Sequence, residues 1–496
     1  MGLVQELSIS NRKYALKIDI DRRHALPVYL QICERFKAAI AAGHLKPGDR
    51  VPALRGLATQ LNTARGTVEM AYEILVDEGY LQMRGAAGTF VSSSLPASVL
   101  KPAARRGREH TGMPRPKPAP AAGPGHEARP LRPGLPALDA FPRKVWSRII
   151  AHRARSVDFA SLTYPDPAGF GPLRERIATY LGLSRGVECT PEQVFVTSGY
   201  RASLELILRS LAKPDDSAWF EEPGYFLARD FLNEARLKLV PVPVDHDGID
   251  VDAGQALAPD ARFAIVTPSH QSPLGATLSL ARRMKLLEWA GRAGSWIVED
   301  DYDSEFRYAG RPLPALKSLD VDDRVIYCGT FSKVLFPGLR LSYVVAPERA
   351  MARFAQLTTS MNAGPPYLLQ AAVADFIAQG HFARHLKRMR ALYAERREVC
   401  ARALEKAFGA KARIERPAGG MHLVMLFNSG DIGPVDDLAI VARAQEAGLA
   451  VSALSSWHIG ARTKRTLRGV VLGFANIVDE AEAARLARML RRAYAG

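Results

Sequence analysis

WIVEDDY at residues 296–302 and VIYCGTFSK at residues 325–333 decide the fold of most of this 496-residue chain. Each stretch begins as an apolar run of strand length and ends in polar side chains, which is typical of a buried strand in a parallel sheet. VFVTSG, AWFEEP and RFAIVTP repeat the pattern, and helical stretches such as RASLELILRSL lie between them. Strands that alternate with helices predict an α/β fold with a mostly parallel sheet. AGGMHLVMLF and VVLGFA, beyond a long helical stretch, predict a C-terminal α+β subdomain.

Polar groups follow five of these strands at the point where each strand ends. They are Ser198-Gly199-Tyr200, Pro223-Gly224-Tyr225, Ser269-His270-Gln271, Asp300-Asp301-Tyr302 and Ser332-Lys333. Because parallel sheets bind ligands at the carboxyl ends of their strands, we expect these groups to meet at one edge. A lysine, a carboxylate, aromatic rings, hydroxyls and helix-start glycines are together what a phosphorylated pyridine aldehyde requires. Each of them alone has a plainer interpretation, such as a solvated lysine or an ordinary helix start.

The chemistry of pyridoxal 5'-phosphate assigns a role to each group. Lys333 is the expected imine-forming amine, which must be neutral to react, and Asp300 is expected beneath the pyridine nitrogen. Tyr302 is placed at the ring oxygen and Tyr225 on the ring face. We expect the phosphate at the helix start after Ser198, where free backbone N–H groups attract an anion. The expected phosphate contacts are Ser198, Gly199, Tyr200, Ser332 and Arg340.

A smaller domain is predicted at residues 22–95. Ile32, Phe36 and Ile40 recur at helical spacing, and two further apolar stripes flank the short gap Asn62-Thr63-Ala64, as in a helix-turn-helix. YLQMRGAAGTFV then predicts a hairpin wing. A winged helix-turn-helix binds double-stranded DNA with its third helix in the major groove. The expected DNA-binding residues are Arg50, Arg55, Thr63, Arg65, Thr67 and Arg84.

A linker at residues 96–135 separates this head from the body at residues 136–496. Pro, Ala, Gly and Arg dominate it, so it cannot bury enough apolar surface to fold. The chain has 67 Lys+Arg against 51 Asp+Glu, a net charge of +16 that favours a polyanionic partner. Its four cysteines form no CxxC pair, which argues against a disulfide scaffold and a zinc cluster, and we expect no metal site. Without a signal peptide or a long apolar run, a cytoplasmic protein is expected.

The head resembles the GntR family of bacterial regulators in LKPGDRVPALRGLATQL, ARGTVEMAYEILVDEGYL and GAAGTFV. It departs from the family at Ala64, where a serine usually caps the recognition helix, and Thr63 is the expected substitute cap. The body resembles the fold-type I aminotransferases in YPDPAGFGPLRERIATYL, PSHQSPLG, EDDYDSEF and GTFSKVLFPGLRLSYVV. Head and body together resemble the MocR subfamily of GntR regulators over nearly the whole chain.

The resemblance implies pyridoxal phosphate on Lys333, Asp300, Tyr302 and Arg340. It also implies a homodimer in which Tyr164 reaches the partner's phosphate, and it places His270 or Gln271 near the ring oxygen. Arg201 stands where many relatives have glutamine; it either strengthens phosphate binding or replaces an amide. Arg468 is the candidate for an effector carboxylate.

Two hypotheses follow for the whole chain. The first is a transcription regulator that binds an operator with paired half-sites and senses pyridoxal phosphate or an amine through an external aldimine. The second is a working aminotransferase with an accessory DNA-binding head. The absence of a clear carboxylate-binding arginine favours the regulator.

Overall fold

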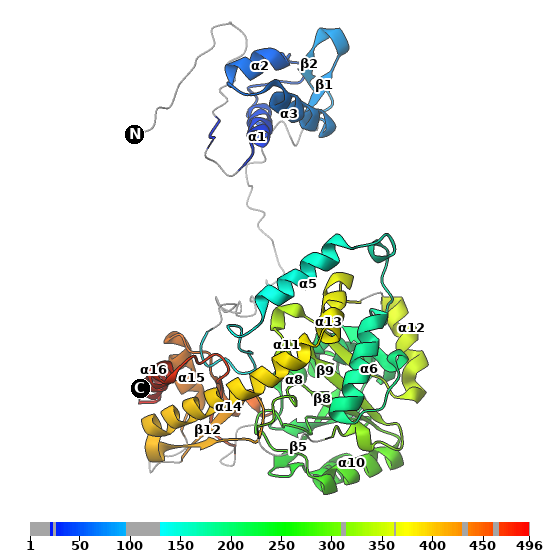
Figure 1. The fold of residues 1–496 in the computed structure, drawn as a ribbon, viewed down its shortest axis with the longest axis vertical. Helices are drawn as coiled ribbons and strands as arrows, with labels where there is room; N and C mark the ends of the chain where they lie inside the picture. Colours follow the sequence, from blue (N-terminus) through cyan, green and yellow to red (C-terminus); the bar gives the residue numbers. More distant parts are fainter. Residues whose placement is uncertain are drawn as a thin grey trace, which may run out of the picture. The chain divides into compact units, whose positions relative to one another are not determined.

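The computed structural model describes residues 20–22, 26–95, 129–308, 314–361, 364–428, 435–459 and 466–495. The chain divides into two compact units with a boundary at residue 120. We call them the head and the body and describe each by itself (Figure 1).

The head holds three helices and a two-stranded hairpin. They are α1 (Val28–Ala41), α2 (Leu54–Gln60), α3 (Arg65–Asp77), β1 (Leu81–Met83) and β2 (Thr89–Val91), with β1 and β2 antiparallel. The predicted apolar stripes form its core, in which Phe36 meets Tyr72 edge to face at 5.5 Å between ring centroids. The winged helix-turn-helix prediction is therefore confirmed.

One local prediction in the head is wrong. The residue that caps α3 is Ala64, and no side chain among the described residues caps this helix. Thr63 therefore does not replace the missing serine, and the first turn of α3 leaves backbone N–H groups available at the start of the expected recognition helix.

The described part of the body holds an eight-stranded sheet in the order β3-β10-β9-β8-β7-β4-β5-β6. The strands are β3 (Val194–Thr197), β4 (Ser217–Glu222), β5 (Lys238–Asp245), β6 (Gly248–Ile249), β7 (Phe263–Val266), β8 (Trp296–Asp301), β9 (Val325–Thr330) and β10 (Ser342–Val345). Neighbours from β5 to β9 are parallel, and β10 is antiparallel to both β9 and β3. Strands β3, β4, β7, β8 and β9 therefore point the same way, and their carboxyl ends share one edge, as predicted.

Helices cover both faces of this sheet. The helices of this part of the body are α5 (Arg143–Arg155), α6 (Gly171–Arg185), α7 (Tyr200–Leu211), α8 (Phe226–Glu234), α9 (Val251–Leu257), α10 (Leu280–Ala293), α11 (Phe331–Val334), α12 (Met351–Met361), α13 (Tyr367–Ala378) and α14 (His381–Phe408). Of these, α5 and α14 pack on α13. Alternate strand residues enter different cores: Phe220 packs with α7, α8 and α12, whereas Trp219 packs with α9 and α10. This alternation is what a pleated strand buried on both faces requires.

The C-terminal subdomain carries an antiparallel sheet in the order β11-β12-β14-β13. Its strands are β11 (Ala412–Glu415), β12 (His422–Phe427), β13 (Ser452–Ala453) and β14 (Gly469–Gly473), and its helices are α15 (Asp437–Glu446) and α16 (Glu480–Ala495). The long helix α14 runs along the body to this subdomain and packs on α16 (Figure 1). The α+β prediction is confirmed.

The boundary of the linker needs one correction. Residues 130–135, which the sequence assigned to the linker, pack on the body: Leu131 is buried, and the N–H groups of Ala450 and Gly473 donate to Pro130 and Leu131 carbonyls. The rest of the predicted linker, apart from Arg129, lies outside the described residues. None of the helices that the structure describes is long and apolar enough to cross a membrane.

Candidate cofactor site

Lys333 lies in the short helix α11, directly after β9. Its Nζ donates a 2.9 Å hydrogen bond to the Gly134 carbonyl, from the loop that leads into the body. Burial lowers the pKa of the Lys333 amine, the negative charges of Asp303 and Asp300 raise it, and the Arg132 charge lowers it. A lysine whose pKa is lowered in this way supplies the neutral amine that attacks a carbonyl.

Asp300 and Asp301, at the end of β8, face opposite sides of the strand. Asp301 forms a buried ion pair with Arg185, 2.9 Å between carboxylate oxygen and Nε, and accepts the Tyr327 hydroxyl at 2.6 Å. Asp300 is also buried, and burial raises its pKa to about 8. It has no ion pair among the described residues, so a cation beside it would stabilise its charged form. A protonated pyridine nitrogen is such a cation.

An anion cradle lies where β3 passes into α7. Gly199 precedes the helix with φ +104°, and a Cβ added there would lie 3.1 Å from the Arg340 guanidinium. The start of α7 and the Arg340 side chain therefore adjoin, and both attract a phosphate. Ser198 and Tyr200 flank this glycine, and the buried Tyr200 hydroxyl acts on Asp300 and lowers its pKa. The Ser332 N–H donates to the Thr330 hydroxyl at the neighbouring strand end.

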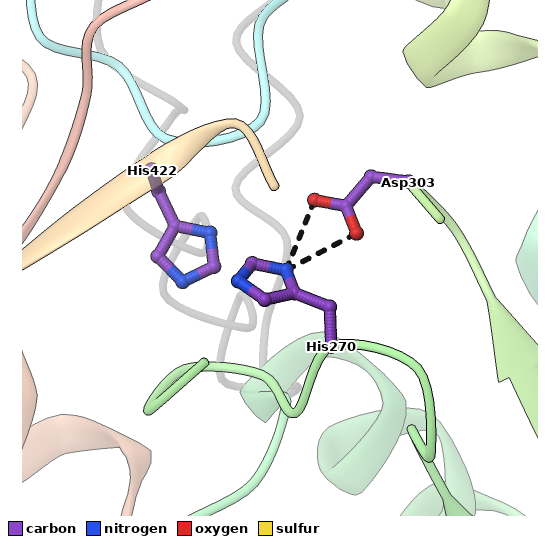
Figure 2. Close-up of side chains that lie close together, drawn as sticks. All are labelled: His270, Asp303 and His422. Atoms are coloured by element: carbon purple, nitrogen blue, oxygen red, sulfur yellow. Dashed lines mark hydrogen bonds and ion pairs between the residues drawn. The ribbon is translucent and has the colours of Figure 1, made fainter. Parts of the chain in front are cut away.

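His270, Asp303 and His422 form a buried group of three side chains (Figure 2), and His270 of this group contacts Tyr302. The His270 Nδ1 lies 3.1 Å from an Asp303 carboxylate oxygen and 3.0 Å from the Tyr302 hydroxyl. The His422 Nε2 donates to the Pro273 carbonyl at 2.8 Å, and burial, followed by the His270 charge, lowers the pKa of His422 to about 4.

The same group bears on the expectation of no metal site. Donor atoms of His270, Asp303 and His422 lie within 4.8 Å of one another, so these side chains could hold a metal ion. Asp303 and one ring nitrogen of each histidine already have hydrogen-bond partners, however. We assign His270, which Asp303 holds through Nδ1, to positioning Tyr302.

His270 and Gln271, the two candidates for the region of the ring oxygen, have different partners in the structure. His270 contacts the Tyr302 hydroxyl, whereas the Gln271 amide donates to the Glu221 carboxylate and to the Pro223 and Ser272 carbonyls. Gln271 thus serves the loop rather than a ligand. Tyr225, at the start of α8, lies close enough to Asp300 that burial, together with the Asp300 charge, raises its pKa to about 12.

Three expected residues lie apart from this group. The Arg201 guanidinium pairs with Glu234 and stacks over Phe231 at 4.9 Å, so it does not join the anion cradle. The Arg468 Nη1 lies 3.6 Å from Oδ1 of the fully buried Asp437, so this arginine already has a carboxylate partner within its own subunit. Tyr164, which the resemblance assigns to the partner's phosphate, is 87% exposed.

Sequence reasoning missed three residues at the site. Arg132 is exposed, and its charge lowers the pKa values of Lys333 and Tyr225, so it lies near both side chains. Gly134 lies so close to Lys333 that an added Cβ would be 2.5 Å from Nζ. Ser272 interacts with the Tyr302 hydroxyl. Arg132 and Gly134 were not predicted because the Pro-rich composition assigned them to the linker. Ser272 was not predicted because the neighbouring His270 and Gln271 were the candidates for this position.

These residues fit pyridoxal 5'-phosphate. The glycine cradle beneath Arg340 suits the phosphate, the unpaired buried Asp300 suits the ring nitrogen, and Lys333 suits the aldehyde. When bound, the cofactor would supply an aldehyde that condenses with primary amines.

The expected DNA-binding residues of the head lie on α2, at the start of α3 and around the wing. Arg50, Arg55, Arg65 and Arg84 are exposed, whereas Thr63, just before α3, and Thr67, in its first turn, are half-buried. The Arg50 guanidinium packs on Gly88 of the wing, and Arg84 stacks over Phe90 at 4.9 Å. Two of the arginines therefore also hold the hairpin.

Comparison with known proteins finds two families in one chain. Residues 28–91 match the gntR family of bacterial regulatory proteins, and residues 146–473 match aminotransferase class I and II. The chain is 38% identical to the probable rhizopine catabolism regulatory protein MocR of Rhizobium meliloti, with 92% of each chain covered. It is 33% identical to the pyridoxine biosynthesis transcriptional regulator PdxR of Corynebacterium glutamicum, covering 92% of this chain and 94% of PdxR.

Among solved structures, the body is similar to the α-aminoadipate aminotransferase LysN of Thermus thermophilus, complexed with N-(5'-phosphopyridoxyl)-L-leucine. The TM-score is 0.66 at 29% identity, and the match covers 74% of this chain and 92% of LysN.

Proposed function

This chain belongs to the MocR type of the GntR-family transcriptional regulators, and we propose that its body binds pyridoxal 5'-phosphate and senses that cofactor or an amine. The observation that carries the proposal is the joint placement of Lys333, Asp300 and the Gly199–Arg340 cradle at one sheet edge. As a DNA-binding regulator it would act in the cytoplasm.

The contact between Lys333 and Gly134 offers a way to pass the signal on. A free Lys333 amine donates to the Gly134 carbonyl. A Lys333 engaged by the cofactor has fewer hydrogens to donate, and an amine ligand that displaces Lys333 restores them. Residues 130–135 lie near the start of the body in the chain, so a change in this loop would act on the segment that connects the body to the head. A coupling of about 1–3 kcal/mol is typical of such effects.

A homodimer would complete both functions. The segment before α6 exposes Phe159, Leu162 and Tyr164 by 74–87%, an apolar surface that a second copy would cover. Tyr164 would then reach the partner's cofactor phosphate, and two heads would bind paired half-sites in the operator.

The alternative function is an active aminotransferase with an accessory head. It is supported by Lys333 and Asp300, which such an enzyme also needs. It is disfavoured because Arg468 is paired with Asp437 rather than available to a substrate carboxylate.

The test uses the full chain and DNA that the chain itself selects from random duplexes. Affinity for the selected duplex is measured with and without pyridoxal phosphate, for the wild type and Lys333→Ala. The proposal predicts that the cofactor changes the affinity about 5- to 150-fold in the wild type and leaves the variant unchanged. Equal affinities in both states, together with steady amino transfer to an oxo acid, would establish the enzyme instead.

A further inference from the structure

Helix α5 presents a row of positive charge on the surface of the body. Its 13 residues, RKVWSRIIAHRAR, include five Arg or Lys and no Asp or Glu. Lys144, Arg148 and Arg155 follow one another at intervals of four and seven residues, which places them on one face of the helix, and all three are exposed. Ile149 is buried against the body.

The first half of α14 adds a second row. Arg384, Lys387 and Arg388 are spaced by three and one along this helix, and residues 381–394 contain no carboxylate. Figure 1 shows α5 and α14 in the same part of the body, with α13 beside them.

An aromatic cluster fixes these two rows near each other. Trp146 of α5 meets Phe376 of α13 at 6.0 Å between ring centroids, and Phe376 lies 5.6 Å from the ring of His381 of α14. Burial, with the charges of Arg384 and Arg148, lowers the pKa of His381, so arginines from both helices lie near this ring. We call Lys144, Arg148, Arg155, Arg384, Lys387 and Arg388 the basic face.

The charges of this face are not balanced by carboxylates. Among the described residues, the ion pair on these two helix segments joins Arg153 to Asp375, and Arg153 is not part of the face. Ordinary solvated surfaces mix both signs of charge, whereas a concentrated single sign is the electrostatic footprint of a polyanion-binding surface. Helix α5 is about 20 Å long, which matches roughly six phosphates along one DNA strand.

We propose that the basic face of the body binds the phosphate backbone of operator DNA, outside the base pairs that the head reads. This inference rests on the proposed DNA-binding function. It makes the body a second DNA-binding surface that contributes affinity without sequence preference, because phosphate contacts position a protein but do not read bases.

The test compares two full-length variants with the same reduction in charge. The first carries Lys144→Gln, Arg148→Gln, Arg384→Gln and Arg388→Gln. The control carries Lys285→Gln, Arg209→Gln, Arg292→Gln and Arg402→Gln, four exposed residues that pair with carboxylates elsewhere on the body. Affinity for the selected duplex, extended by about 20 base pairs on each side, is measured against salt concentration.

Removal of one phosphate-binding charge lowers the slope of log affinity against log salt by about 0.9. We expect the face variant to lower the slope by about two to four and the control to leave it unchanged. On a duplex trimmed to the footprint of the head, the face variant and wild type should agree. Equal slopes for wild type and face variant on the long duplex would overturn the proposal. A face variant that becomes monomeric in light scattering would also overturn it, because the face would then join two copies.

Failure of this inference is distinguishable from failure of the proposed function. If the wild type selects no preferred sequence, the regulator proposal fails. The salt slopes of the two variants on random DNA still test the face. Melting temperatures equal to wild type show that both variants fold, and Arg148→Gln alone provides a milder second test.

Discussion

Replacement of Arg340 by alanine tests the anion cradle directly. The Arg340 guanidinium packs against Gly199, one residue before the start of α7, so it is placed to bind a phosphate held by that helix. Arg201 provides a matched control, because it lies in the first turn of the same helix but pairs with Glu234. The two variants remove the same charge from neighbouring positions.

The size of the effect follows from the exposure of Arg340. A hydrogen bond to a charged group contributes about 1.5–3 kcal/mol, and the exposed Arg340 side chain places the loss at about 1.5–2 kcal/mol. At about 1.4 kcal/mol per tenfold change, Arg340→Ala should weaken pyridoxal phosphate binding about 10- to 30-fold. Titration of cofactor-free protein, followed by cofactor absorbance, measures this affinity.

Pyridoxal, which lacks the phosphate, separates this role from a general loss of structure. Arg340→Ala should leave pyridoxal affinity unchanged, and Arg201→Ala should leave both affinities unchanged. Equal losses for pyridoxal and pyridoxal phosphate would refute the assignment of Arg340 to the phosphate. A loss at Arg201 as large as that at Arg340 would show that the cradle is wrongly placed.

Three further substitutions probe the lysine, the carboxylate and the head. Burial raises the pKa of Asp300 to about 8, above its value in the unfolded chain, so the folded, cofactor-free chain loses stability as the pH rises from about 4 to about 8. The melting temperature of Asp300→Asn should therefore rise relative to wild type between about pH 5 and pH 8, and a constant difference would contradict this. Gly134→Ala places a Cβ 2.5 Å from the Lys333 amine, at φ +68°, so the end of the Lys333 side chain must shift, and pyridoxal and pyridoxal phosphate binding should weaken equally. Unequal losses would place Gly134 at the phosphate. Arg65→Ala should weaken binding to the selected duplex by about 1–3 kcal/mol and relax specificity at one base pair, as a binding assay on single-base variants would show; an unchanged preference would remove Arg65 from base reading.

The sheet edge could be predicted from the sequence because a change from apolar to polar residues marks the end of each buried strand. Buried strands such as β8 and β9 are largely apolar runs, and the residue after each run must lie at the edge. The strands must also run in the same direction for their carboxyl ends to meet. Because β10 is antiparallel to both β9 and β3, strand β3 runs in the same direction as β9. Lys333, Asp300 and Tyr302 could therefore be placed before the fold was known.

Side-chain partners could not be predicted in the same way. Arg201 and Arg340 are both cations near the start of α7. Arg201 pairs with Glu234 on α8, whereas Arg340 lies against Gly199. Arg468 is likewise paired with Asp437, which lies at the start of a different element of the C-terminal subdomain. Arg132 could not be predicted because a Pro-rich composition does not show which residues of a linker pack on a domain.

Borohydride reduction of the protein loaded with pyridoxal phosphate, followed by mass mapping of its peptides, tests the central claim most directly. We expect a single pyridoxyl group on the amine of Lys333 and no reducible adduct in Lys333→Ala. Attachment to a different lysine, or an adduct that survives in that variant, would contradict it.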